Sequence, residues 1–385
     1  MLRATQAQTA HFILQKNFLT TPAADLIEMV AQLGGLPAQP LLTPHLAALS
    51  RLLTYRPAEL MAALEQERRL IMAELMRGQP YLLPVDQFPL YHAATARQRR
   101  QNLNSEFRLW DLENAEVEQL GQAILAELGD EPATVETIAA RLPARHVREL
   151  RQTSRGGRVS TTSNVALALH WLTATGLLYA GRDPATGLDW RSERVVYAPL
   201  RACYPDLDLN DTPDEATAQA TVVRSYLAVF GPASEADISF WTGFGKSETA
   251  RAINALSRET TLVLVEGLPG MMILLKAQAE TLTATEPPAT PQVKLLPADD
   301  PYSTAHRASR SRYFTHPAWQ RQVFSNVGAA QPTILINGQM AGVWQVPPAG
   351  QPPTWHWLGE AEQSFGGEIE AEVEAQLARL AAFFG

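Results

Sequence analysis

The chain has 385 residues, of which 46% are hydrophobic and 19% charged, with a formal net charge of −8 and a single cysteine, Cys203. A chain this long exceeds what one hydrophobic core usually supports, so we expect two or more domains. One cysteine excludes an intrachain disulfide and a zinc cluster built from cysteines. The negative charge argues against a protein that coats nucleic acid indiscriminately, but it is compatible with a local basic surface.

Two further exclusions concern membranes and cofactors. No apolar run reaches the ~18 residues that span a bilayer, and the first six residues lack the apolar core of a secretion signal. The sequence therefore predicts a cytoplasmic protein with no membrane partner. It contains no CxxC, HExxH, P-loop or GxGxxG motif, so we expect no metal site and no cofactor.

The most informative stretch near the start is Leu-Gly-Gly-Leu-Pro-Ala-Gln-Pro-Leu at 33–41, between helical patterns at 24–33 and 44–53. Its glycines permit positive φ, and its prolines bias the residues before them away from helix. These constraints predict a stiff turn that presents one polar side chain, Gln39. An amide donates and accepts hydrogen bonds together, so Gln39 is a candidate for holding a water molecule.

Helices followed by a β-hairpin, the outline of a winged helix, recur three times along the chain. The first unit has helical patterns at 24–33, 44–53 and 57–67 and hairpin strands within 69–78 and 81–84. The second has them at 116–128, 133–142, from Pro143 and at 165–175, with strands at 177–180 and 194–197. The third has them at 217–230, from Ser234 and at 246–257, with strands at 260–266 and 271–275.

The remaining segments are connectors and a C-terminal part. A polar connector is expected at 95–115, an acidic linker at 205–215 and a proline-rich linker at 284–292. The pattern at 333–344 predicts two strands joined by a tight Asn-Gly turn. A third strand is expected at 355–358 and an amphipathic helix at 368–384.

The predicted fold is thus mainly α with β-hairpins, of the α+β class. It consists of three tandem winged-helix units and a C-terminal β-rich α+β region. Their expected bounds are 1–95, 96–204, 205–284 and 285–385.

Arginines concentrate in the segment 141–158, which has a single acid, Glu149; they are Arg141, Arg145, Arg148, Arg151, Arg155 and Arg158. Spacings of three or four residues predict that Arg141, Arg145 and Arg148 share one helix face. Arg151, three residues further on, would extend that face. The last two lie in a Gly-Gly loop followed by hydroxyl side chains. Arginines, hydroxyls and backbone N–H groups bind phosphates, so we expect contact with the DNA backbone. The other interpretation is a solvated face partnered by acids elsewhere in the chain.

A second basic cluster comprises His306, Arg307, Arg310 and Arg312. Two interpretations stay open for it. The cluster contacts DNA, or it braces a domain interface by pairing with Asp299 and Asp300. Trp241 and Trp344 lie in apolar periodic contexts, so we expect them in the core rather than on a surface that stacks bases.

Five stretches together resemble the bacterial winged-helix DNA glycosylases of the AlkZ-like group, and they follow one another in the family's order. They are Leu-Gly-Gly-Leu-Pro-Ala-Gln at 33–39 with Leu-Ser-Arg at 49–51; Arg-Gly at 77–78; Phe-Gly-Pro-Ala-Ser-Glu-Ala-Asp at 230–237 with Trp-Thr-Gly at 241–243; Asp-Asp-Pro-Tyr at 299–302 with Arg307 and Arg310; and Ile-Asn-Gly at 336–338 with Gly-Val-Trp at 342–344. The resemblance implies three tandem winged helices and a C-terminal β-rich part. It also implies excision of alkylated bases and, in some members, unhooking of interstrand crosslinks. We therefore place Arg51, Arg77, Arg307 and Arg310 among the expected DNA-binding residues.

The resemblance also bears on catalysis. Catalytic members of the family carry a Gln, an apolar residue and a second Gln in the turn that this chain fills with Pro37, Ala38 and Gln39. A related subgroup keeps the first Gln and has Asp third. Here the third position is retained, whereas Pro37 has neither an amide side chain nor a backbone N–H. An N7-alkylated purine is cationic and leaves as a neutral base, so the enzyme needs mainly a placed water and electrostatic help.

The first interpretation is a monofunctional DNA glycosylase in base-excision repair of alkylated or crosslinked duplex DNA. Gln39 would position the water, with His45 as a helper, and no lysine accompanies the turn to support a lyase step. Both residues also have a structural interpretation. Gln39 would then be a turn glutamine that bonds the backbone, and His45 an ordinary histidine at the start of a helix. We expect a monomer that is cytoplasmic, and nucleoid-associated when bound.

Two rivals remain. Pro37 favours a non-catalytic winged-helix DNA-binding or regulatory protein. The negative net charge permits a protein-interaction scaffold that has lost DNA binding.

Overall fold

The computed structural model describes residues 1–385 except 155, 184–185, 187–190, 193, 348–350 and 385, and it leaves out the side chains of 362–366 and 368. The chain forms two compact units. The first unit joins Met1–Tyr55 to Ala216–Gly385, and the second is Arg56–Glu215. Each unit has its own hydrophobic core. The division into three winged helices at 1–95, 96–204 and 205–284 stays a prediction.

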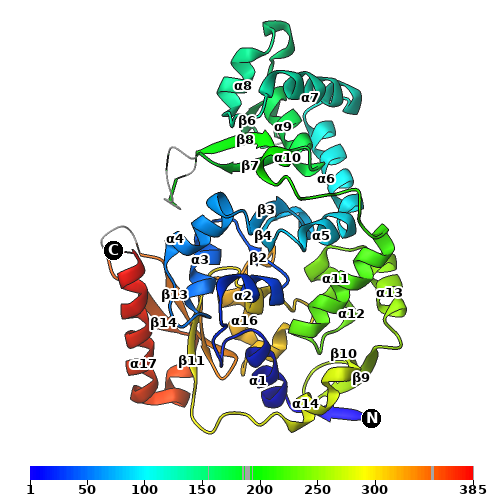
Figure 1. Cartoon of the computed structure of the whole chain (residues 1–385). Coiled ribbons are helices and arrows are strands. Elements are labelled where there is room, and N and C mark those ends of the chain that lie inside the picture. Colours follow the sequence, from blue (N-terminus) through cyan, green and yellow to red (C-terminus); the bar gives the residue numbers. More distant parts are fainter. Residues whose placement is uncertain (155, 184–185, 187–190, 193, 348–350, 385) are drawn as a thin grey trace. The chain divides into compact units, whose positions relative to one another are not determined.

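The described residues of the second unit form helices and three antiparallel hairpins (Figure 1). Its first elements are α4 (Pro57–Met61), the π-helix η1 (Ala62–Gln66), β3 (Leu70–Glu74), η2 (Met76–Gly78), β4 (Pro80–Pro84), α5 (Phe88–Ala94), α6 (Ala96–Leu109) and α7 (Asn114–Leu128). Then follow α8 (Val135–Arg141), η3 (Ala144–His146), β5 (Glu149–Thr153), β6 (Val159–Ser163), α9 (Asn164–Ala174), β7 (Leu178–Arg182), β8 (Val195–Pro199) and α10 (Leu200–Cys203). The core lies between α7, α8 and α9, around Ile124, Ile138 and Leu172.

Two predictions for this unit are wrong. The expected polar connector at 95–115 is largely helix α6, because Leu103 and Phe107 lie four residues apart and give an otherwise charged helix a buried face. The helix expected from Pro143 is only the three-residue turn η3, and strand β5 follows it. The side chains of β5 alternate between exposed and half-buried, which is the period of a strand. The arginines at 141–151 therefore do not share a helix face.

Two of the sheets formed by the described residues lie wholly within the first unit. Its N-terminal elements are β1 (Leu2–Ala4), α1 (Gln6–Lys16), α2 (Leu26–Gln32), β2 (Leu36–Pro37) and α3 (Leu42–Leu49). After the second unit come α11 (Glu215–Phe230), α12 (Glu235–Thr242), α13 (Lys246–Ala255), β9 (Thr260–Val265), β10 (Met272–Leu275), η5 (Lys276–Gln278) and α14 (Ala279–Ala284). The rest are β11 (Val293–Leu296), α15 (Pro301–Thr304), η6 (Arg310–Tyr313), η7 (Pro317–Trp319), α16 (Gln320–Val323), β12 (Thr333–Ile336), β13 (Gln339–Gln345), β14 (Thr354–Trp357) and α17 (Ala361–Phe384).

The sheets of the first unit confirm the predicted hairpins. Strand β9 pairs with β10 in the expected hairpin, and β1 joins β9 in parallel. Strands β11 to β14 form an antiparallel sheet in chain order, against which α17 packs Val373 and Leu377. The turn between β12 and β13 has positive φ at both Asn337 (51°) and Gly338 (84°), as an Asn-Gly hairpin turn requires. Trp241 and Trp344 are buried, as expected.

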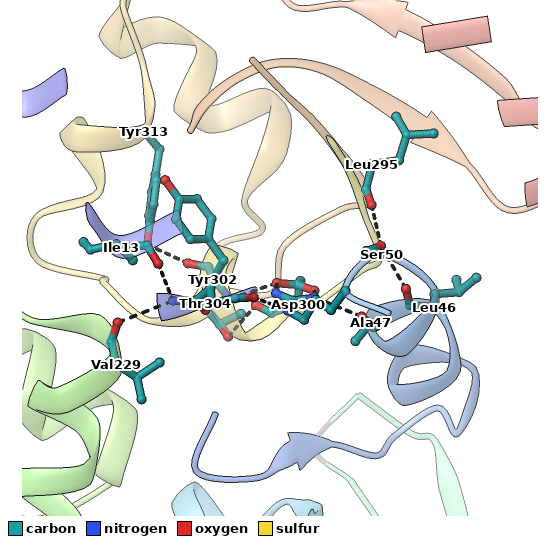
Figure 2. A network of polar contacts seen from close by, with 12 residues as sticks. Ile13, Leu46, Ala47, Ser50, Val229, Leu295, Asp300, Tyr302, Thr304 and Tyr313 are labelled. Carbon is teal, nitrogen blue, oxygen red and sulfur yellow. Dashed lines mark hydrogen bonds and ion pairs between the residues drawn. The ribbon is translucent and has the colours of Figure 1, made fainter. Parts of the chain in front are cut away.

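A buried ion pair fixes the C-terminal end of α3 (Figure 2). The Arg51 guanidinium donates to both carboxylate oxygens of Asp300, at 2.8 and 2.7 Å. It also donates to the backbone oxygens of Asn17 (2.9 Å) and Ala47 (3.2 Å). Neither side chain of the pair is exposed to solvent. The prediction that Arg51 contacts DNA is therefore wrong, because all of its surface is used inside the first unit.

A second polar cluster joins three elements of the second unit. His170 of α9 bonds Glu106 of α6 through Nδ1 (2.6 Å) and Glu74 of β3 through Nε2 (2.7 Å). The hydrogen bonds to Glu106 and then Glu74 raise the pKa of His170 to about 10. The imidazole is therefore a cation held between two carboxylates at neutral pH.

We expect Arg51→Met to destabilise the first unit by about 3–5 kcal/mol, because it leaves the Asp300 carboxylate buried without its cation. Urea unfolding measures the loss. The matched control is Arg224→Met, which removes another two-pronged pair, to Glu259 at 2.7 Å, from the surface of the same unit. That change should cost no more than about 1 kcal/mol. Equal losses for the two variants would show that burial of the Arg51 pair is irrelevant.

We expect the contribution of His170 to stability to depend on pH. The folded-state pKa of about 10 lies above the unfolded value of ~6.5. The stabilisation is therefore complete below pH ~6.5 and is lost as pH rises through 10. The difference in unfolding free energy between wild type and His170→Gln, measured by urea from pH 6 to 10.5, should shrink along that range. A difference that stays constant across the range would contradict the charged assignment.

Candidate functional site

The turn between α2 and α3 has the geometry that its sequence predicts. Gly34 and Gly35 adopt φ of 69° and 94°, and the Gly35 N–H bonds the carbonyl of Val30 at 3.0 Å to close the end of α2. Leu36, Pro37 and Ala38 are buried behind the turn, whereas the side chain of Gln39 is exposed. The structure records no hydrogen bond from the Gln39 side chain to any described residue. The turn thus offers solvent one amide.

His45 occupies a different environment from Gln39. It lies on α3, is fully buried, and bonds the hydroxyl of Tyr55 through Nδ1. Its ring also packs against Phe383, with the ring centroids 6.3 Å apart. A buried ring has no surface through which to reach a substrate, so the geometry favours the structural interpretation of His45 as a histidine of the helix start.

Two arginines of the segment 141–158 line a pocket in the second unit, and others lie on the β5–β6 hairpin. Arg145 and Arg148 line a pocket of about 260 Å³ together with Glu116, Gln119, Leu120, His146 and Asn164. The buried Asn164 shapes it, since its side chain accepts a hydrogen bond from the backbone N–H of Arg148 (2.8 Å) and donates one to the backbone carbonyl of His146 (2.9 Å). Arg148 also pairs with Glu116. For this arginine, the expectation of an acid partner elsewhere in the chain is therefore met.

The hairpin β5–β6 carries the next basic residues. Arg151 is exposed and lies opposite Thr161 in the register of the two strands. Arg158 is exposed beside Gly157, whose φ is 79°, at the turn of the hairpin. No ion pair joins Arg151 or Arg158 to any residue within the described ranges. Arg155 lies outside the described residues.

The second basic cluster divides between the surface and the interior. Arg310 and Arg312 are buried; Arg310 donates to the Gly328 carbonyl (2.8 Å), and Arg312 donates to the Pro232 carbonyl (3.0 Å). The prediction that Arg310 contacts DNA is wrong, because its guanidinium lies inside, 3.8 Å from the centre of the Phe324 ring. The expected pairing of this cluster with Asp300 is wrong, because Asp300 is bonded to Arg51. The bracing of a domain interface through Asp299 stays a prediction.

Arg307 and Arg77 keep some exposure. Arg307 is exposed and lies over the ring of Phe240 at 5.0 Å. Arg77 is half-buried in η2, where it adopts φ of 59° and donates to Gln79 at 3.2 Å. His306 is buried within the first unit, where burial and then Arg312 lower its pKa to about 3. His306 is therefore neutral and structural at physiological pH.

The structural role of Asp237 was not predicted from the sequence. This buried carboxylate of α12 accepts hydrogen bonds from the backbone of Ala308 and Ser309 and from the Ser234 hydroxyl. It thereby ties the loop after α15 to the start of α12. Ser234 and Asp237 have the spacing of a capping box, which is the signal that identifies the carboxylate from sequence.

Within the described residues, no group of three or more His, Cys, Asp or Glu side chains has the arrangement of a metal site. No helix there is long and apolar enough to cross a membrane.

Comparisons with known proteins agree with one another. The family model described as DNA glycosylase AlkZ-like matches residues 30–383. An interstrand DNA cross-link repair glycosylase of Streptomyces sahachiroi is 25% identical over 159 residues, which are 40% of this chain and 41% of that protein. The match thus spans about two fifths of that relative.

The fold is similar to a solved structure of the Streptomyces sahachiroi DNA glycosylase AlkZ. The TM-score is 0.73 at 21% identity, and the likeness covers 92% of this chain and 91% of that one. Because the family model covers nearly the whole sequence, the chain belongs to the AlkZ-like family of DNA glycosylases.

Proposed function

We propose that this protein is a monofunctional DNA glycosylase that hydrolyses the N-glycosidic bond of N7-alkylated bases. The observation that carries the proposal is Gln39, an exposed amide on a turn whose preceding residues Leu36, Pro37 and Ala38 are buried. A rigid backbone therefore holds this side chain toward solvent. Its geometry also weighs against a turn glutamine whose amide serves the backbone.

The main requirement of this reaction is that the catalyst places the attacking water. When the bond between C1′ and N9 breaks, its electron pair goes to the cationic purine, which departs neutral. A water oxygen then bonds to C1′ and releases its proton to solvent. Gln39 orients that water by accepting a hydrogen bond from one of its O–H groups or by donating one to its oxygen. Holding the water in line accounts for most of the rate gain that we assign to the turn.

The partner that we propose is double-stranded DNA, bound by a monomer in the cytoplasm. The exposed Arg145, Arg151 and Arg158 suit phosphate contacts, as does the exposed Arg307 of the first unit. One relative is named an interstrand DNA cross-link repair glycosylase. That name supports crosslinked duplex as a further substrate.

The rival function is a non-catalytic DNA-binding protein, and Pro37 favours it. The residue is buried in β2 and supplies neither an amide side chain nor an N–H to a water. A glycosylase with one glutamine should therefore be slower than one with two. The rival predicts duplex binding without base release.

We expect the protein to release the base from a duplex that contains a single N7-methylguanine. We expect Gln39→Ala to slow that release at least about 100-fold, because the water loses its fixed position. Single-turnover base release at saturating protein measures the rate. The matched control is Gln322→Ala, which removes another exposed glutamine side chain from the first unit and should leave the rate unchanged. Release that survives Gln39→Ala would move the active site elsewhere, and binding without release would favour the rival.

We expect the double variant Arg151→Gln/Arg158→Gln to weaken duplex binding equally for all sequences. Each lost phosphate contact should reduce the slope of log affinity against log salt by about 0.9. Fluorescence anisotropy at 50–200 mM salt measures the slope. The control is Arg56→Gln/Arg201→Gln, which makes the same charge change at two other exposed arginines of the second unit. An equal change in slope for the two double variants would indicate an effect of net charge rather than of the hairpin.

A further inference from the structure

A pocket of about 270 Å³ lies between α3 and α17 in the first unit. Its walls come from the end of α3, the segment up to Tyr55, strand β11 and the last turns of α17. Helix α17 runs beside the edge strand β11 (Figure 1). The polar residues that line the pocket are Ser50, Tyr55, Lys294, Gln376 and Arg379. We call it the α3–α17 pocket.

The charge of this pocket is positive. Lys294 is half-buried on β11 between the buried residues Val293 and Leu295. Burial and then the nearby charges of Arg51 and Arg379 lower the pKa of Lys294, while Glu372 acts in the opposite direction. The structure records no ion pair for Lys294 or Arg379 with any residue that it describes. Two cations thus share one cavity without a paired acid in the described part of the chain.

We propose that the α3–α17 pocket binds a phosphate group of the DNA backbone. Lysine and arginine are usual partners of phosphate oxygens, and Lys294 and Arg379 bring one of each to the same cavity. The Gln376 amide helps to shape the wall instead, because its Nε2 donates to the Val293 carbonyl (2.9 Å) and to Glu372 (2.7 Å). The apolar side chain of Leu53, 84% exposed, lies on the rim. An exposed apolar group beside two cations suits a nucleotide, which has a sugar and a base, better than a free inorganic phosphate.

The position of the pocket sets its distance from Gln39. Leu49, at the C-terminal end of α3, lines the pocket, and Gln39 lies just before the N-terminal end of the same helix. A helix of eight residues is about 12 Å long. With α3 lying along the axis of B-form DNA, as we propose, a rise of 3.4 Å per nucleotide makes that length roughly three or four nucleotides. The proposal rests on the proposed function because it takes DNA as the source of the phosphate.

The first arm of the test compares lysine variants by duplex anisotropy across a salt series. Lys294→Gln should weaken binding severalfold and reduce the salt slope by about 0.9. Lys294→Arg keeps the charge and should restore both values. Lys276→Gln makes the same charge change at an exposed lysine of the first unit and should leave both unchanged. A Lys294→Gln variant with the wild-type slope, or an equal loss in the control, would overturn the proposal.

The second arm locates the phosphate. Duplexes with one N7-methylguanine carry a single neutral methylphosphonate at successive positions within six nucleotides of the lesion. Wild type should lose affinity at a position three or four nucleotides away, and Lys294→Gln should show no further loss there. Additive losses at every position would overturn the assignment.

Two further measurements, protection of Lys294 by inorganic phosphate and base release from the duplex, distinguish the remaining outcomes. If inorganic phosphate protects Lys294 from amine acetylation while the salt slope is unaffected by Lys294→Gln, the occupant is a free phosphate and the DNA assignment fails. Duplex binding without base release would contradict the proposed glycosylase activity, but both binding experiments could still be interpreted. A wild-type protein that does not bind duplex overturns the pocket assignment as well.

Discussion

The buried pair between Arg51 and Asp300 is the interaction on which the first unit depends. It removes two charges from water and offsets that cost with two short hydrogen bonds between them. The remaining guanidinium bonds reach the backbone at the ends of α1 and α3. A single side chain therefore holds three segments together that lie far apart in the sequence.

Helix α3 is held by this pair and by two hydrogen bonds, one to strand β11 and one to the segment that follows it. The Ser50 hydroxyl donates to the Leu295 carbonyl (2.8 Å), and the Thr43 hydroxyl donates to the Ala298 carbonyl (3.3 Å). The helix is thus fixed at both ends. A side chain that begins or follows such a helix is held more precisely than one on a free loop, which is what water placement requires. The turn with Gln39 and the α3–α17 pocket both use this support.

Local patterns in the sequence predicted local structure well. The turn at 33–41, the Asn337–Gly338 turn and the β9–β10 hairpin all follow from backbone preferences that act over a few residues. The errors came from tertiary context. Arg51 and Arg310 resemble surface arginines in sequence, and Asp300, the partner of Arg51, lies 249 residues away. Strand β5 resembled a helix because arginine spacing of three or four was counted without the alternation of exposed residues that defines the strand. The cations of the α3–α17 pocket come from separate elements, so sequence alone could not bring them together.

The catalytic role of the Gln39 turn can be tested with a structure of the protein bound to duplex DNA that carries 2′-fluoro-N7-methyl-deoxyguanosine, whose fluorine slows bond cleavage. If Gln39 places the attacking water, a water should lie within hydrogen-bond distance of its amide and face C1′ of the modified nucleotide. A complex in which the modified sugar lies away from the turn, or in which Gln39 faces it without a water, would contradict the assignment of the turn as the catalytic element.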